Sequence, residues 1–185
     1  MRHIVGVLFI MLFISSCGGH NAKLSRSFDD FLGQTIVIPR LDEAICICNG
    51  RDTIVPISTE SHNGRIVIYY DSSTCSSCEI SELWRWKFFT DEIRQYDIDM
   101  LFIFAPSEAK EDEVITYLNL YHLPWPVYID TDNLFSRNNK SLPHEKLFHT
   151  FLLDRKNRVV LIGDPIKSYE MQKLYKNVIE KFRDS

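Results

Sequence analysis

The sequence predicts an α/β domain in which a central mixed sheet is flanked by helices and preceded by an N-terminal β-hairpin. Two observations support this prediction. Residues 66–70 and 99–105 are runs of β-branched and aromatic residues typical of buried strands, and each is followed by apolar residues at helical spacing. A helix between two such strands lets them pair in parallel. The later apolar runs at 149–154 and 159–163 flank Lys156-Asn157 closely enough to form an antiparallel hairpin.

The remaining elements follow from turn residues and from the period of the apolar positions. They are a short strand at 35–38, a hairpin at 45–48 and 53–55 around Asn49-Gly50, a helix at 108–121, a strand at 127–130, a polar connection at 134–142 and a last helix at 168–182. In that last helix, helical spacing predicts four residues on the core-facing side: Met171, Leu174, Val178 and Phe182.

The N-terminus predicts export and a lipid anchor. Arg2 precedes an apolar stretch at 4–14 that is too short to span a bilayer, and small residues follow it. Residues 14–17, Ile-Ser-Ser-Cys, resemble a bacterial lipoprotein processing box. That resemblance implies cleavage before Cys17, lipidation of its sulfur, and a membrane-tethered location in the bacterial cell envelope, facing the periplasm. The alternative is an ordinary secretory signal that leaves Cys17 as a free thiol.

Composition narrows the class of protein further. The 185 residues carry a net charge of −4 without an evident basic patch, which argues against nucleic-acid binding. Gly and Pro contribute only seven residues each, which argues against a collagen-like or low-complexity chain. We therefore expect a signal peptide at 1–16, a lipid-anchored tether at 17–34 and one domain at 35–185.

The chemistry is expected where the first buried strand meets the following helix. Asp71, Ser72, Ser73 and Thr74 favour a turn, and the spacing of Ile80, Leu83, Trp84 and Phe88 predicts an amphipathic helix beyond it. Cys75 then lies at the first helical turn, where the helix dipole stabilises a thiolate. Cys78 lies on the same face, within reach of a disulfide. Cys75 is therefore the expected nucleophile and Cys78 the resolving thiol, unless the pair is a zinc half-site or a structural disulfide.

Residues 63–70, followed by Cys75-Ser76-Ser77-Cys78, resemble the active-site strand and motif of thioredoxin-like proteins. In particular, the chain is similar to the membrane-tethered thiol–disulfide oxidoreductases of bacterial cell envelopes, over about residues 35–185. The resemblance implies a thioredoxin-like fold, a redox-active disulfide with no cofactor besides it, and protein thiols or disulfides as substrates.

Two positions depart from that family's pattern. His149 occupies the place of a cis-proline that normally precedes the strand at 150–154, and we expect a trans peptide there. His149 is then either a solvated loop residue or an imidazole within reach of Cys75. Such an imidazole would stabilise a thiolate as the cation or ligate a metal when neutral. The second departure is Tyr69, which replaces a buried carboxylate; neither Asp71 nor Glu79 matches that position.

Two more cysteines lie on the N-terminal hairpin. Cys46 and Cys48 are two residues apart, so both face the same side of a strand, a geometry that disfavours a bond between them. They are either buried thiols or a metal-binding or relay pair.

Three functions remain open on the sequence alone. The leading hypothesis is a thiol–disulfide oxidoreductase that uses Cys75 and Cys78. The second is a thioredoxin-like metal-binding module for copper or zinc, with Cys75, Cys78 and His149 as ligands. The third is a non-catalytic interaction domain in which the two cysteines form a structural disulfide.

Overall fold

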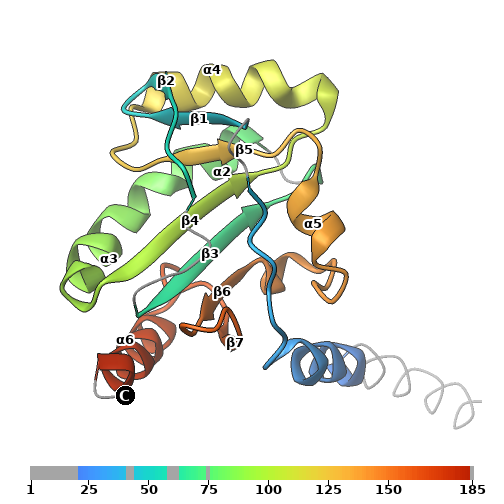
Figure 1. Cartoon of the computed structure of the whole chain (residues 1–185), viewed down its shortest axis with the longest axis vertical. Coiled ribbons are helices and arrows are strands. Elements are labelled where there is room, and N and C mark those ends of the chain that lie inside the picture. Colours follow the sequence, from blue (N-terminus) through green and yellow to red (C-terminus); the bar gives the residue numbers. More distant parts are fainter. Residues whose placement is uncertain (1–20, 41–43, 58–62, 74–75, 184–185) are drawn as a thin grey trace, which may run out of the picture.

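The computed structural model describes residues 21–40, 44–57, 63–73 and 76–183 of the chain. A mixed sheet of seven strands in the order β2-β1-β5-β4-β3-β6-β7 forms its centre (Figure 1). The strands are β1 (Ile45–Cys48), β2 (Arg51–Thr53), β3 (Gly64–Tyr70), β4 (Ile98–Phe104), β5 (Val127–Ile129), β6 (Thr150–Leu153) and β7 (Val159–Ile162). The three central strands β3, β4 and β5 are parallel, and each outer pairing is antiparallel.

The predicted fold class is confirmed by this topology. The parallel strands β3 and β4 are joined through helices, the β6–β7 hairpin follows, and the β1–β2 hairpin adds to the edge beside β5. In that hairpin, Asn49 and Gly50 adopt the positive φ values of 52° and 66° that a tight two-residue turn requires. The returning strand is β2 rather than 53–55, because this short turn pairs Cys48 directly with Arg51.

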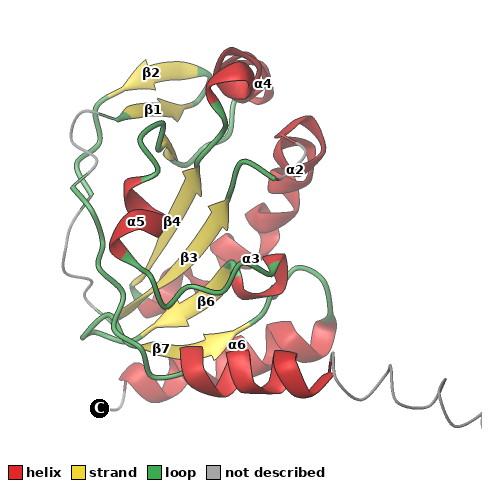
Figure 2. Ribbon diagram, turned by 90° about the vertical axis from the view of Figure 1, so that its right-hand side faces the viewer, coloured by secondary structure: helices red, strands yellow, loops and turns green. Residues whose placement is uncertain are grey.

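Helices cover both faces of the sheet, and Figure 2 shows α5 on the side opposite α2 and α3. The longer helices are α2 (Ser76–Glu82), α3 (Trp86–Ile93), α4 (Glu111–Tyr121), α5 (Leu134–Asn138) and α6 (Tyr169–Arg183). Short 3₁₀ turns are η1 (Leu83–Arg85), η2 (Arg94–Tyr96), η3 (Glu108–Lys110) and η4 (Lys146–Phe148). No helix in these described ranges combines the length and apolar character needed to cross a bilayer.

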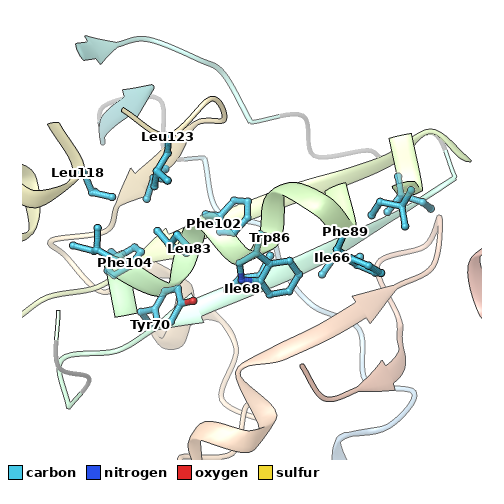
Figure 3. Close-up of a cluster of buried hydrophobic side chains, with 14 of the residues drawn as sticks. Ile66, Ile68, Tyr70, Leu83, Trp86, Phe89, Phe102, Phe104, Leu118 and Leu123 are labelled. Atoms are coloured by element: carbon cyan, nitrogen blue, oxygen red, sulfur yellow. The ribbon is translucent and has the colours of Figure 1, made fainter. Parts of the chain in front are cut away.

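Strand β3 divides the core into two layers because its side chains alternate between the two faces of the sheet. Ile66, Ile68 and Tyr70 pack with α2, α3, α4 and α6, as Figure 3 shows for the α2–α3 part of that layer. Val67 and Tyr69 face the opposite layer, which contains α5, η4 and the helix at 21–31. Every residue of β3 is buried, as expected for a central strand.

The prediction for the inner face of the α2–α3 region was partly wrong. Ile80 and Leu83 are buried as expected, but Trp84 is 39% exposed and Phe88 is 81% exposed. Trp86 and Phe89 fill the core instead. The cause is η1, which interrupts the α-helix with a turn of three residues and rotates the following positions out of the expected register.

The inner face of α6 also differs from the prediction. Met171, Val178 and Phe182 pack against the core as expected, but Leu174 is exposed, while Tyr175 and Ile179 are fully buried. The Tyr175 hydroxyl donates a hydrogen bond of 2.7 Å to the carbonyl of Gly163, which turns this side of the helix toward the sheet.

The N-terminal boundary of the folded domain lies earlier than predicted. Residues 21–31, assigned to the tether, are helical, and Phe31 is fully buried in edge-on contact with Phe148 and Phe151. The predicted strand at 35–38 is absent from the described chain apart from an isolated bridge between Thr35 and Arg158. The Asn139 side chain bonds the N–H and the carbonyl of Val37 and so takes the place of a strand partner.

Candidate functional site

The predicted site residues divide into those that the structure describes and those that it does not. Cys17 and Cys75 both lie outside the described residues, so lipidation and the nucleophile stay predictions from the sequence. Cys78 lies in α2, and its side chain is exposed at the surface. Cys78 is the third residue of this helix, and solvent can reach its thiol.

The end of β3 forms the turn that its residues predicted. Asp71 Oδ1 accepts hydrogen bonds from the Ser73 backbone N–H at 3.0 Å and from the Ser73 hydroxyl at 2.6 Å. An aspartate that bonds the backbone two residues ahead closes a local turn. The chain is thus turned at the carboxyl end of β3, directly before the cysteine motif.

An ion pair ties α2 to the segment that precedes β6. Glu79, the residue after Cys78, pairs with Lys146 at the start of η4. The Glu79 side chain is 19% exposed and that of Lys146 is 54% exposed, so the contact is partly shielded from water. The motif helix and the segment leading to His149 are therefore in direct contact.

His149 is buried, with 4% of its surface exposed, so its interpretation as a solvated loop residue was wrong. Its carbonyl accepts a 2.9 Å hydrogen bond from the Tyr69 N–H, which continues the pairing of β3 with β6 by one residue. No peptide bond among the described residues is cis, which confirms the expected trans geometry at this position. The imidazole is thus held beside β3, against the ring of Tyr69.

The hydrogen bonds of His149 fix its tautomer. Nε2 lies 3.1 Å from the carbonyl oxygen of Pro143, an atom that can only accept, so Nε2 carries the proton. Burial lowers the pKa of His149, and it outweighs the opposing effect of the nearby Asp71 carboxylate. The neutral imidazole therefore predominates near neutral pH, which argues against the predicted role as a cation that stabilises a thiolate.

Tyr69 and His149, the two departures from the family pattern, are neighbours in the structure. Their rings meet edge-on with centroids 5.2 Å apart, and the Tyr69 hydroxyl donates a 2.9 Å hydrogen bond to Asn133 Oδ1. Burial raises the pKa of Tyr69 to about 12, so the phenol stays protonated under ordinary conditions. Tyr69 consequently does not replace the missing carboxylate as a base.

A buried carboxylate that the sequence analysis missed lies on the same face of the sheet. Asp130 directly follows β5, and only 2% of its surface is exposed. Its two oxygens accept hydrogen bonds from the N–H groups of Leu134 and Phe135, each 2.8 Å long, at the start of α5. Burial raises its pKa against the effect of these bonds. An aspartate four positions before Leu134, the first residue of α5, was the available signal for this capping role.

The burial of Cys46 and Cys48 favours their interpretation as buried thiols over that of a metal-binding or relay pair. Cys46 is buried, and burial raises its pKa to about 11; Cys48 is half-buried and its pKa is also raised by burial. Within the part of the chain that is described, no group of three or more His, Cys, Asp or Glu side chains is arranged to hold a metal ion.

Comparison with solved structures confirms the thioredoxin-like fold. An oxidised thioredoxin-like protein aligns over 80% of this chain and 97% of its own, with 13% identity and a TM-score of 0.53. The thioredoxin domain of a thiol-disulfide oxidoreductase from Bacteroides vulgatus aligns over the same shares, with 10% identity and a TM-score of 0.52. Identities this low show the fold alone. No protein-family model matches the sequence, and no curated protein matches it.

Proposed function

We propose that the protein is a thiol–disulfide oxidoreductase in which Cys75 and Cys78 form the redox-active pair. The observation that carries the proposal is the place of the motif in the fold. Ser76, Ser77 and Cys78 are the first residues of α2, the helix that follows the carboxyl end of the central strand β3, in a fold whose similar solved structures include a protein described as a thiol-disulfide oxidoreductase. A thiol pair at such a strand–helix junction is suited to disulfide exchange.

The proposed reaction has two steps. The thiolate of Cys75 attacks one sulfur of a substrate disulfide, which forms a mixed disulfide and releases the other substrate sulfur as a thiolate. Cys78 then loses its proton and attacks Cys75, which releases the second substrate thiolate and leaves an intramolecular disulfide. The substrate gains two electrons and the cysteine pair loses two; the reverse sequence oxidises a dithiol substrate. No cofactor beyond the disulfide takes part.

The proposed location is the bacterial cell envelope, with the chain tethered to the membrane through lipidated Cys17 and the domain facing the periplasm. The support is the processing-box sequence at 14–17 and an exported environment that permits disulfides. The proposed partners are protein thiols or disulfides, and nucleic acid is not among them.

The metal-binding alternative has less support. It would use Cys75, Cys78 and His149, and a soft-metal site of this kind usually needs a fourth ligand or an open coordination position. The described residues offer no ready-made cluster that could supply it.

Trapping of mixed disulfides tests the proposed function. Cys78→Ala should accumulate mixed disulfides through Cys75, because nothing remains to resolve them, whereas Cys75→Ala should not. Cys48→Ala, on strand β1 of the N-terminal hairpin, is the matched control and should behave as the unmodified protein. Equal trapping by the two motif variants, or none by either, would contradict the proposal, and stoichiometric bound metal would favour the alternative.

A further inference from the structure

Two exposed aromatic side chains flank a hollow between α3 and the start of α6. Phe88 of α3 is 81% exposed, and Tyr169, the first residue of α6, is 72% exposed. Both line a hollow of about 430 Å³, together with the buried ring of Phe89 and the apolar side chains of Pro165 and Ile166. Single exposed apolar residues are common, but two aromatic rings at one hollow indicate a binding surface. We call it the α3–α6 hollow.

Hydrogen bonds hold the walls of the α3–α6 hollow in place. Arg85 Nη2 donates a 2.9 Å bond to the carbonyl of Ile166, and both residues line the hollow. Gln172 Nε2, also in the lining, donates a 3.0 Å bond to Glu92 Oε2 and so joins α6 to α3. The hollow is therefore formed before a partner binds, which lowers the cost of ordering on binding.

The charges at the α3–α6 hollow cancel. Its two cationic lining residues each have an acidic partner beside the hollow: Arg85 pairs with Glu82, and Lys167 pairs with Asp164. A charged group placed in the hollow would lose hydration and would find no unpaired opposite charge among these lining residues. The hollow is therefore suited to a neutral, apolar side chain.

The helical path from Cys78 to Phe88 places both residues on one face. It is continuous, because Glu82, Arg85 and Trp86 at its junctions all have right-handed helical backbone angles. Successive residues turn by about 100° in an α-helix and by about 120° in a 3₁₀ turn such as η1. Phe88 then lies within about 20° of Cys78 around the axis, whereas an uninterrupted α-helix would place it about 80° away. The 3₁₀ turn that exposes Phe88 thus aligns it with the thiol.

An exposed face connects the thiol to the hollow. Glu82 and Arg85, four and seven residues after Cys78, are exposed between the two. With a rise of about 1.5 Å per α-helical residue and about 2.0 Å per 3₁₀ residue, Phe88 lies about 16 Å from Cys78 along the axis. An extended peptide covers that length in about five residues. A protein segment that meets the motif with its disulfide can therefore place a nearby side chain in the hollow.

We propose that the α3–α6 hollow binds a neutral apolar side chain of a protein substrate, about five residues from the substrate cysteine that reacts. The proposal rests on the proposed function, which brings a protein disulfide to the motif. A protein substrate is the favoured occupant because the exposed face leads from Cys78 to the hollow. Apolar side chains are mostly buried in folded proteins. The substrate class is therefore extended or unfolded segments with an apolar residue near the disulfide.

Reduction of model peptides tests the proposal. Each neutral peptide holds one cysteine as a mixed disulfide with glutathione, and mass spectrometry follows the release of its free thiol. One set carries phenylalanine five residues before or after the cysteine, and the matched set carries alanine there. The full chain, reduced beforehand, is used in phospholipid nanodiscs so that no free detergent competes for the hollow.

The phenylalanine peptide should be reduced about tenfold faster than the alanine peptide in at least one of the two orientations, the scale set by partial burial of one aromatic side chain. Phe88→Ser and Tyr169→Ser should each remove this preference without slowing the alanine peptide. Both side chains are exposed, so neither change threatens the fold. Ile54→Ser, at an 87% exposed apolar residue next to β2, is the matched control and should keep the preference.

Photo-cross-linking separates failure of the docking from failure of the proposed function. A peptide with benzoylphenylalanine for phenylalanine and serine for cysteine needs no thiol chemistry, and it should attach within residues 85–89 or 165–172. Equal reduction of the phenylalanine and alanine peptides would overturn the docking and leave the proposed function standing. Cross-links in these ranges without reduction of any peptide would overturn the proposed function, and with it the assignment to a substrate. Dimers of the unmodified chain that Phe88→Ser abolishes would make a second copy the occupant and overturn the proposal.

Discussion

The thiols on β1 and the thiol on α2 differ in their exposure to solvent. Cys46 and Cys48 are two residues apart on a strand, and Cys46 is sealed in the core layer that contains Tyr69 and Phe135. Cys78 is on a helix, three residues after Cys75, and is exposed. Burial raises the pKa of the strand thiols, which suppresses the thiolate that reacts. Burial therefore separates the strand thiols from the helix thiol.

The largest expected contrast is in alkylation. A pKa raised from 9.0 to about 11 leaves Cys46 with about a hundredfold less thiolate than an ordinary cysteine. In the reduced native protein, iodoacetamide should therefore modify Cys78 at least about a hundredfold faster than Cys46, and burial of Cys46 should widen the ratio. Peptide mass spectrometry after timed quenching measures both rates. As the control, the two cysteines should react at equal rates in denaturant. Similar alkylation rates of Cys78 and Cys46 in the native protein would contradict the expected difference.

Substitution should affect the stability of the protein more at Cys46 than at Cys78. Cys46→Ser places a hydroxyl in an apolar layer and should lower the free energy of unfolding by about 1–3 kcal/mol, the cost of burying an unpaired polar group. Cys78→Ser changes an exposed helix position and should alter it by no more than about 0.5 kcal/mol. Urea unfolding of both variants under reducing conditions is the measurement. A Cys46→Ser protein as stable as the parent would mean that the strand thiol is not packed as described.

The buried histidine beside the motif should make stability depend on pH. His149 has a pKa lowered from 6.5 in the folded state, so the unfolded chain binds more protons between that lowered value and 6.5. The free energy of unfolding should therefore fall as pH drops below about 6.5, with a slope of at most about 1.4 kcal/mol per pH unit from this residue. His149→Gln should flatten that part of the profile, whereas His144→Gln should shift it only slightly, because the His144 charge is a minor cause of the lowered His149 pKa. An identical slope in the parent and in His149→Gln would show that other groups cause it.

The smallest expected effect is the coupling between α2 and η4. A double-mutant cycle with Glu79→Gln and Lys146→Met should give a coupling of about 0.5–1 kcal/mol, because the Glu79 side chain is mostly shielded from water. The exposed Lys87–Asp91 pair on α3 is the matched control and should give about 0.3–0.5 kcal/mol. A coupling no larger than the control would mean that this ion pair does not fasten the motif helix to the segment before His149.

The sequence by itself determined the features that depend on neighbouring residues. The buried run of β3, the Asp71 turn, the Asn49-Gly50 hairpin and the order of strands and helices all follow from local propensity and from the spacing of apolar residues. The expected trans peptide before Thr150 also follows from the identity of His149 alone. Where local structure departs from ideal geometry, as at η1, the same spacing assigned Trp84 and Phe88 to the wrong face.

Only the tertiary structure decided what surrounds the motif. Pairing of β3 with β6 brings Tyr69 against His149, which are 80 positions apart in the sequence, and seals the imidazole from water. Folding of α5 over the sheet buries Asp130, and the contact between α2 and η4 pairs Glu79 with Lys146. Burial and these long-range contacts set the protonation states, because desolvation depends on what packs over a group rather than on its neighbours along the chain. For this reason the sequence presented His149 as a loop residue, a cation or a neutral metal ligand, whereas the folded chain makes it a buried, neutral imidazole.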